Sequence, residues 1–159
     1  MHDQALVGAV CRMTPQKGMD LLVEAADEIM RLDCQFVLAG QGDPEMEAGL
    51  KALADAHPHR LVYLPDCDEA CVHRILAGSD IWLMPSRFEP CGLTQMYAMR
   101  YGTLPLAHAS GGLVDTVDDP ADGEDEATGF HMPEASASAL VEGLKRSLEF
   151  FADPPRWRR

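Results

Sequence analysis

The chain has 159 residues, of which 47% are hydrophobic and 25% charged, a composition typical of one globular domain and not of a disordered segment. Thirteen basic against 26 acidic side chains give a net charge of −13, which argues against binding to a nucleic acid backbone. The sequence contains no apolar run near the roughly 18–20 residues of a membrane span and no visible secretory signal. Five scattered cysteines form no disulfide framework, so we expect a reducing compartment.

Short apolar runs alternate with amphipathic segments in the first half of the chain. The apolar runs predict strands at Ala5–Val10, Phe36–Ala39 and Leu61–Leu64. After the first strand, apolar residues recur in steps of three and four, which predicts one helix from Gly18 to Leu32. A second helix is expected to reach about Ala56, just before the third strand.

The same alternation continues in the second half of the chain. We expect these elements in order: a helix at Glu69–Ala77, a strand at Ile81–Met84, a helix at Leu93–Arg100, a strand at Thr103–Ala107, a short helix after the Gly111-Gly112 pair and a last helix at about Ser136–Phe150. Gly78 is expected to end the first of these helices, because glycine tolerates a positive φ. The segment between the glycine pair and the last helix is acidic and rich in turn residues, which indicates a solvated loop.

Strands separated by helices join through right-handed crossovers into a parallel sheet that is covered on both faces. The sequence therefore predicts an α/β fold, a Rossmann-like parallel sheet with helices on both faces, in one domain over residues 1–150. Ligands of such sheets bind at the carboxyl ends of the strands. The loops at those ends are Cys11–Gly18, Gly40–Asp43, Pro65–Glu69, Pro85–Leu93 and His108–Leu113.

The first of these loops carries two cations, Arg12 and Lys17, around Thr14 and Pro15. Two cations at a strand end, beside a helix N-terminus, suit an anion such as a diphosphate. A solvated loop with two surface cations is the alternative, and spacing alone favours it. Gly40–Gly42 is a lone G-x-G without the full dinucleotide fingerprint, so a tight turn is the better interpretation.

The loop Pro85–Gln95 is the most informative segment of the chain. At its end the free N–H groups of Gly92, Leu93 and Thr94 face the strand-end crevice, where they are able to hold a phosphate. Glu89 then lies beside that anion site, where its carboxylate suits hydrogen bonds to sugar hydroxyls or stabilisation of a cation-like transition state. A carboxylate that offsets the helix macrodipole is an equally good reading of Glu89 from the sequence alone.

Gly111 and Gly112 also follow a strand and precede a short helix, so they count among the candidate substrate-binding residues, with a plain turn as the alternative. Cys67 and Cys71 lack a second pair at metal-ligand spacing, which indicates structural thiols and no metal site. Ser86, His108 and Asp115 are the residue types of a Ser/His/Asp triad, but no G-x-S-x-G elbow supports this assignment.

Three segments closely resemble the bacterial glycogen synthase and plant starch synthase family and follow one another in the family's order. They are Ser86–Gln95 (SRFEPCGLTQ), Tyr97–Pro105 and Gly111–Val117. The basic loop Arg12–Gly18, which ends in Gln-Lys-Gly, looks like another signature of that family. The resemblance covers nearly the whole chain, from Ala5 to about Arg156. A ten-residue run with supporting motifs in the right order is a specific signal.

This resemblance implies a retaining glucosyltransferase that moves glucose from ADP-glucose to the non-reducing 4-hydroxyl of an α-1,4-glucan, without a metal or another cofactor. The family has two Rossmann-like domains that face each other across a cleft, the B-type glycosyltransferase fold. The chain looks like the C-terminal, donor-binding half, and residues 151–159 look like the start of a truncated crossover segment. The facing N-terminal domain is its expected partner, and without it we expect the chain to be inactive.

The resemblance also implies a role for each matching residue. Arg12 and Lys17 neutralise the departing diphosphate, and Glu89 binds hydroxyls of the donor glucose and favours the transition state. The remaining contacts are to the sugar from Cys91 and the backbone of Gly92, and to the phosphates from the amides of Leu93 and Thr94.

Two departures from the family pattern are visible. Asp66-Cys67 stands where the family often has Gly-Tyr, and that tyrosine lies near the adenine. The preference for an ADP-linked over a UDP-linked donor therefore stays open. Tyr97 replaces a second carboxylate found in many related transferases, as is usual for this branch. The alternatives are a UDP-glucose-using sibling or a non-catalytic module derived from a synthase. The expected location is bacterial cytoplasm, or plastid stroma for a plant or algal source.

Overall fold

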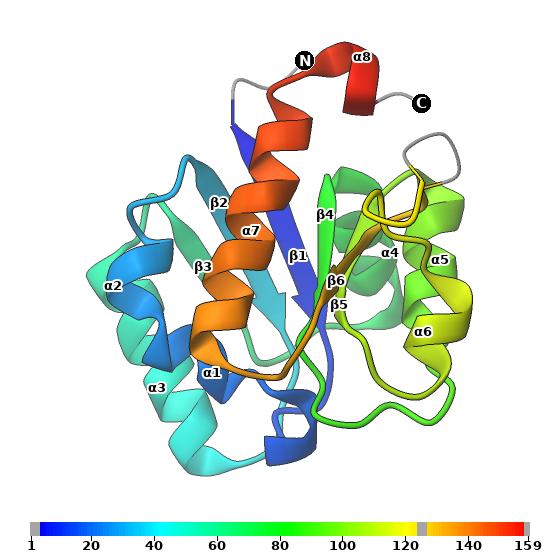
Figure 1. The fold of residues 1–159 in the computed structure, drawn as a ribbon. Helices are drawn as coiled ribbons and strands as arrows, with labels where there is room; N and C mark the ends of the chain where they lie inside the picture. Colours follow the sequence, from blue (N-terminus) through cyan, green and yellow to red (C-terminus); the bar gives the residue numbers. More distant parts are fainter. Residues whose placement is uncertain (1–3, 124–126, 158–159) are drawn as a thin grey trace.

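A computed structural model describes residues 4–123 and 127–157 and shows a six-stranded parallel sheet between two layers of helices (Figure 1). The strands are β1 (Ala5–Val10), β2 (Cys34–Ala39), β3 (Leu61–Leu64), β4 (Ile81–Met84), β5 (Leu104–His108) and β6 (Phe130–Met132). Their order in the sheet is β3-β2-β1-β4-β5-β6, which is the doubly wound order of a Rossmann sheet. The predicted fold class is confirmed.

The helices are α1 (Asp20–Glu24), α2 (Ala26–Ile29), α3 (Pro44–Ala56), α4 (Glu69–Gly78), α5 (Thr94–Tyr101), α6 (Gly112–Thr116), α7 (Ala137–Phe151) and α8 (Pro154–Trp157), with a 3-10 turn at Pro15–Lys17. Side chains cap three of them: Asp43 accepts from the N–H groups of Glu45 and Met46, Asp68 from Cys71, and Ser136 from Ala139. Each cap satisfies helix N–H groups that have no partner within the helix.

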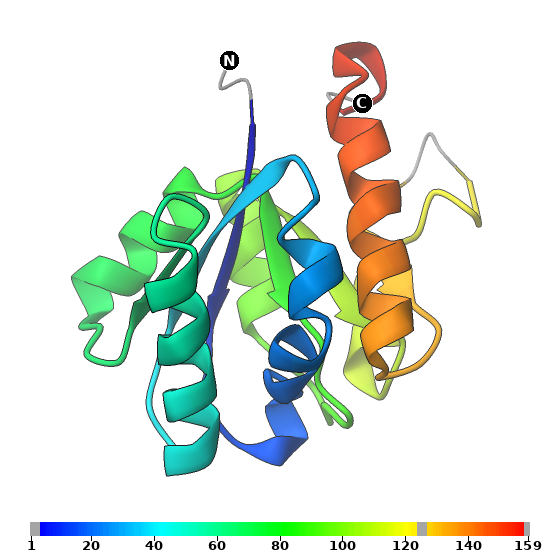
Figure 2. The same ribbon diagram turned by 90° about the vertical axis from the view of Figure 1, so that its left-hand side faces the viewer.

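Alternate residues of the buried strands supply two separate cores. On β4, for example, Ile81 and Leu83 enter the core beneath α1, α2, α3 and α7, whereas Trp82 and Met84 enter the core beneath α4, α5 and α6. The turned view shows α7 beside α1 and α2 on the first of these faces (Figure 2). Because helices cover both faces, the central strands are largely buried, and β4 is buried along its whole length.

The predicted helix from Gly18 to Leu32 is wrong in its continuity. The structure has two short helices there, α1 and α2, which meet at Ala25 (φ −87°, ψ 7°). The apolar residues of both pieces, Leu22, Ala25 and Ile29 among them, still enter one core. The periodicity therefore identified the buried face correctly, but it does not detect a break of one residue.

The strand β6 was not predicted, because it is three residues long and follows the acidic segment. Its position depends on a buried carboxylate: Asp119 accepts from the His131 N–H at 2.6 Å and pairs with Arg146 of α7 at 2.5 Å. Arg146 also donates to the carbonyl of His131 at 2.9 Å. Asp119 is thus part of a structural ion pair and not of a solvated loop, while residues 124–126 of the acidic segment lie outside the described residues.

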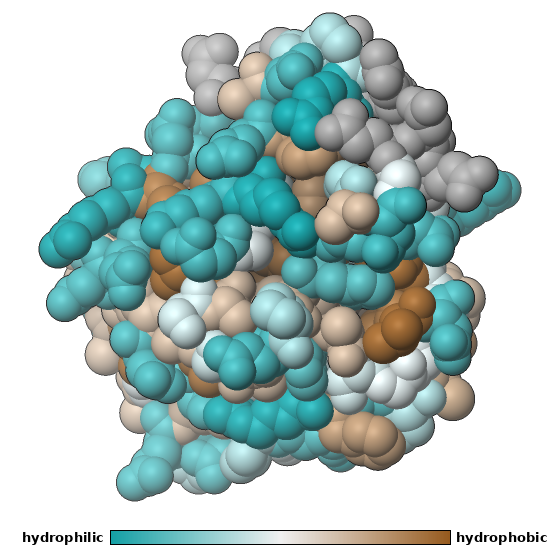
Figure 3. All heavy atoms as spheres, in the orientation of Figure 1, coloured by the Kyte–Doolittle hydropathy of each residue, from teal (hydrophilic) through white to brown (hydrophobic). Residues whose placement is uncertain are grey.

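The face that carries α7 is mostly hydrophilic, with a hydrophobic patch at the lower edge over the β4–α5 loop and another over α6 (Figure 3). Phe88, Leu93 and Val114 are among the exposed apolar side chains, each more than half accessible to solvent. Within the described residues, no helix is long and apolar enough to cross a membrane.

Candidate functional site

The loops after β1 and β4 meet at one edge of the sheet, below the strand arrowheads in Figure 1. The Arg87 N–H donates to the Gln16 carbonyl at 2.8 Å, and the Gln16 side chain donates to the Phe88 carbonyl at 3.0 Å. These two bonds join segments that are about 70 residues apart in the sequence. The two most informative loops of the sequence therefore form one surface.

Lys17 and Glu89 form an ion pair at the centre of this surface. Their side chains are only 19% and 11% exposed, so water screens their charges weakly. The Ser86 hydroxyl lies 3.4 Å from the same Glu89 oxygen that Lys17 contacts. The sequence placed a cation and a carboxylate at the strand ends, and the structure brings the two into direct contact.

Arg12 lies at the exposed rim of the same loop, next to the half-buried Cys11. Burial raises the pKa of the Cys11 thiol to about 11, while the charges of Lys17 and Arg12 lower it and that of Glu89 raises it. The charges of all three predicted catalytic side chains, Arg12, Lys17 and Glu89, therefore act on Cys11, whose thiol is protonated at neutral pH.

The turn Cys91–Leu93 leads into α5, whose first residue is Thr94. Leu93 occupies the N-cap position and makes no side-chain capping bond. Among the described residues, no carbonyl or side chain accepts from the N–H groups of Gly92, Leu93 and Thr94. This helix start consequently presents free donors and the positive end of the helix dipole at the strand ends.

Gly111 and Gly112 pack against the backbone that carries Glu89. The Gly112 N–H donates to the Glu89 carbonyl at 3.1 Å and to the Pro90 carbonyl at 3.2 Å. Gly111 has a φ of +54°, and a Cβ at this position would overlap the Glu89 carbonyl oxygen. The glycine pair thus supports Glu89 from behind, in addition to turning the chain into α6.

Arg87 and Asp20 form a two-pronged ion pair that the sequence did not reveal. The two guanidinium nitrogens of Arg87 lie 2.9 and 2.7 Å from the two carboxylate oxygens of Asp20. This hydrogen-bonded pairing lowers the pKa of Asp20 and raises that of Arg87. The pair fastens the β4–α5 loop to α1, and only a fold places residues so distant in sequence side by side.

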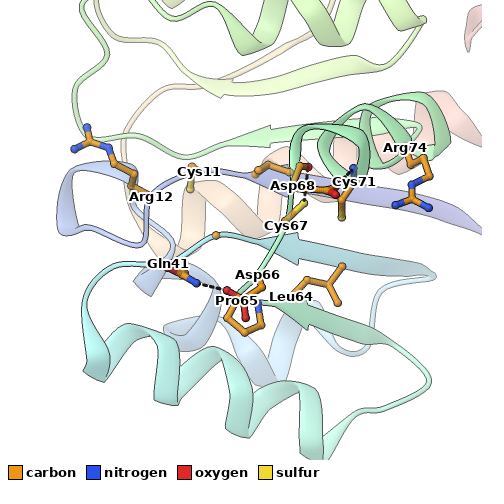
Figure 4. A pocket seen from close by; sticks show the side chains of 12 residues that line it. Cys11, Arg12, Gln41, Leu64, Pro65, Asp66, Cys67, Asp68, Cys71 and Arg74 are labelled. Atoms are coloured by element: carbon orange, nitrogen blue, oxygen red, sulfur yellow. Dashed lines mark hydrogen bonds between the residues drawn. The ribbon is translucent and has the colours of Figure 1, made fainter.

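A cavity of about 920 Å³ opens beside this surface, between the ends of β1, β2 and β3 and the start of α4 (Figure 4). Arg12 and Arg74 lie at its opposite ends, and the Gln41 side chain donates to Asp66 on its wall. Cys67 and Cys71 face it from the start of α4, and burial together with a hydrogen bond to Cys71 raises the pKa of Cys67 to about 12.

Other sequence candidates do not assemble into separate sites. His108 Nδ1 contacts the Ser86 backbone carbonyl at 2.8 Å and not the hydroxyl, and Asp115 is exposed, so no triad exists. The G-x-G turn packs on the β1 loop, where the Met13 N–H donates to the Gln41 carbonyl at 2.8 Å. The described residues contain no cluster of three or more His, Cys, Asp or Glu side chains that suits a metal ion.

Lys17 and Thr94, the first residue of α5, line one small cavity of about 150 Å³, and Glu89 contacts Lys17. This geometry suits an anion that lies between Lys17 and the N-terminus of α5, with Glu89 beside it. Fixed cations and helix N–H groups stabilise negative charge without reorganising. A carboxylate in the same place accepts hydrogen bonds from hydroxyl groups of a ligand. The adjacent cavity is large enough for a nucleoside-sized group.

Comparison with known proteins gives consistent relatives. The chain is 48% identical to the glycogen synthase of Aromatoleum aromaticum, over 98% of the chain and 32% of that protein. Its structure matches the catalytic domain of starch synthase IV from Arabidopsis thaliana bound to ADP and acarbose, with a TM-score of 0.87, 35% identity and coverage of 99% of this chain and 33% of that chain. A sucrose-phosphate synthase from Thermosynechococcus elongatus matches with a TM-score of 0.76, 30% identity and coverage of 98% and 38%.

The chain spans about a third of the length of the curated relatives that it matches. Its structural neighbours are glycosyltransferases of the B-type fold, and the chain corresponds to one of the Rossmann-like domains of that fold. The family described as glycosyl transferases group 1 matches residues 1–154. The chain therefore belongs to the group 1 glycosyl transferases.

Proposed function

We propose that the chain is the donor-binding domain of a retaining glucosyltransferase that transfers glucose from ADP-glucose to the non-reducing 4-hydroxyl of an α-1,4-glucan. The observation that carries this proposal is the Lys17–Glu89 pair together with the uncapped start of α5, whose first residue, Thr94, lines the same small cavity as Lys17. The glycogen synthase relatives, and a starch synthase structure that holds ADP, support the choice of donor.

In this proposal the diphosphate lies between two sets of donors. Arg12 and Lys17 supply cations on one side, and the N–H groups of Gly92, Leu93 and Thr94 supply the helix terminus on the other. Glu89 accepts hydrogen bonds from hydroxyls of the donor glucose, and Cys91 and the Gly92 backbone contact the sugar. Gly111 and Gly112 keep the Glu89 backbone in place.

The chemistry then depends on leaving-group charge. The bond between C1 of glucose and the diphosphate oxygen breaks, and the acceptor 4-oxygen bonds to C1 on the same face, while its proton leaves with ADP. Negative charge grows on the diphosphate during this step, where Arg12, Lys17 and the helix terminus stabilise it. Glu89 balances the positive charge that develops on the sugar ring.

The nucleoside occupies the cavity of Figure 4 in our proposal. Its wall carries Asp66 and Cys67 where the family often has Gly-Tyr, so the base contact differs from that of a typical synthase. Gln41 already pairs with Asp66, which leaves the rest of the cavity for the base and the ribose.

We expect the purified 159-residue chain to show no measurable glucan elongation with ADP-glucose. It spans about a third of its relatives, and a second wall of the cleft is needed to exclude water and to align acceptor with donor. Incorporation of labelled glucose into glycogen measures this, with the full-length Aromatoleum aromaticum relative as the positive control. Robust elongation by the chain alone would contradict the expectation.

We also propose that the glucan acceptor and an N-terminal domain are the partners of this domain, and that residues 151–159 begin the segment that crosses to it. Of that segment, Arg158 and Arg159 lie outside the described residues. The bacterial relatives favour the bacterial cytoplasm as its location, with the plastid stroma as the location for a plant or algal source.

An NMR amide titration with ADP, and with UDP as the control, tests the donor class. We expect saturable shifts at Lys17 and at Gly92, Leu93 and Thr94, with tighter binding of ADP than of UDP. Stronger binding of UDP would move the chain to a sibling transferase that uses UDP-glucose. The absence of shifts at millimolar ADP in a folded chain would favour a non-catalytic module.

A further inference from the structure

We infer that Gln95 is a positioning residue that fixes the Cys91–Thr94 turn in the shape needed to present its N–H groups to a diphosphate. This inference rests on the proposed function. Gln95 is the second residue of α5, its side chain is fully buried, and it does not line the cavity of Figure 4. Its role is therefore to act on the ligand through the turn and not by touching it.

The side-chain amide of Gln95 lies within hydrogen-bond distance of three acceptors. Its Nε2 lies 3.2 Å from the Cys91 carbonyl, 3.2 Å from the Gly92 carbonyl and 3.0 Å from the Thr116 hydroxyl. Carbonyl oxygens only accept, so the NH2 end of the amide has to face them. The chemistry of the partners thus fixes the orientation of the side chain.

The same amide connects the turn to the glycine-rich segment after β5. Thr116 donates its hydroxyl proton to the Gly112 carbonyl at 2.8 Å and accepts from Gln95. Gly112 in turn donates to the Glu89 carbonyl. Gln95 therefore links the proposed phosphate-binding turn with the backbone that carries the sugar-binding carboxylate.

Anchoring two carbonyls also sets the direction of two N–H groups. In a trans peptide unit the C=O and N–H bonds point in opposite directions. When Gln95 holds the Cys91 and Gly92 carbonyls toward the interior, the N–H groups of Gly92 and Leu93 have to point away from it. Neither N–H has a partner among the described residues, as a site kept open for a ligand requires.

Gly92 and Gln95 fit each other closely. Gly92 has a φ of +66°, and a Cβ there would lie 2.6 Å from Gln95 Oε1. This oxygen is buried and has no hydrogen-bond partner among the described atoms. A buried amide that keeps one oxygen unsatisfied is costly, and the contacts of its NH2 group, whose two hydrogens are shared among three acceptors, are what hold it in place.

The test compares Gln95→Glu with the wild-type chain for binding of ADP and of adenosine. Glutamate keeps the size of the side chain but replaces the donor with an oxygen that repels the Cys91 and Gly92 carbonyls. We expect ADP affinity to fall by about tenfold or more, because the N–H groups lose their alignment. Adenosine carries no phosphate, so its affinity should stay within about twofold if the turn acts only on the diphosphate.

Gln35→Glu is the matched control, because it makes the same chemical change and adds the same charge. Gln35 is an exposed residue of β2 whose amide donates to the His59 carbonyl at 3.2 Å, away from the site. ADP affinity of this variant should match the wild type. A folded Gln95→Glu protein that keeps wild-type ADP affinity, or that loses ADP and adenosine equally, overturns the inference.

Thr116→Val provides a second measurement if Gln95→Glu does not fold. It removes one partner of the amide, so we expect a smaller loss confined to ADP, together with altered amide shifts at Gly92 and Leu93. Unchanged shifts and ADP affinity in this variant would overturn the inference as well. A wild-type chain that binds no ADP would instead overturn the proposed function, so the two failures are distinguishable.

Discussion

Replacing Lys17 by alanine should weaken ADP binding by roughly a hundredfold, which corresponds to the loss of a weakly screened charge contact. The change removes a cation and also leaves Glu89 without its ion-pair partner at 11% exposure. The unpaired carboxylate then repels the incoming diphosphate. Isothermal titration calorimetry with ADP measures the effect.

Replacing Glu89 by alanine should change ADP affinity far less. ADP lacks the glucose whose hydroxyls Glu89 is proposed to bind, and the change frees Lys17 from its present partner. The double variant is expected to bind ADP better than Lys17→Ala alone, because the repelling carboxylate is gone. Equal losses in the two single variants would count against the assignment of Lys17 to the phosphates.

Lys51→Ala is the control for the charge change in this series. Lys51 lies on α3, 70% exposed, and pairs with Asp55 one turn away. Water screens such a pair, so its removal should lower the free energy of unfolding by at most about 1 kcal/mol. If Lys51→Ala weakened ADP binding as much as Lys17→Ala, the effect would come from net charge and not from the site.

Strands with two covered faces were the most predictable elements of this fold. The bounds of β1 and β4 agree with the apolar runs in the sequence, because no residue of these two central strands is exposed to solvent. The edge strand β6 depends on Asp119 and Arg146, which are 27 residues apart. No local pattern reports an ion pair of that span, so this strand was missed.

The candidate site shows the same division. The rule that ligands bind at strand ends brought Lys17 and Glu89 to one edge of the sheet, and the structure places them in contact. The pairing of Arg87 with Asp20 and the bonds of Gln95 were not predictable in this way. A single glutamine in a helix has no chemical pattern of its own, and its partners become visible only when the loops have folded together.

A large loss of stability is expected from Gly111→Ala. Its φ of +54° and ψ of −135° lie in a region that other residues avoid, and a Cβ there overlaps the Glu89 carbonyl oxygen. Backbone strain of this kind costs 1–3 kcal/mol, so strain and overlap together should lower the free energy of unfolding by about 3 kcal/mol or more. Urea denaturation followed by circular dichroism measures this change.

Substitutions at two other glycines separate the two causes of that loss, which are backbone strain and overlap of the added Cβ. Gly102 has a φ of +81° but open space around it, so Gly102→Ala should cost about 1 kcal/mol from conformation alone. Gly78 ends α4 with no atom within 4 Å and no positive φ, so Gly78→Ala should stabilise the chain slightly. A Gly111→Ala variant no less stable than Gly102→Ala would show that the Glu89 backbone yields easily. If it does not yield, the glycine pair is what keeps Glu89 within reach of Lys17, and the proposed site depends on these two glycines as well as on its charged residues.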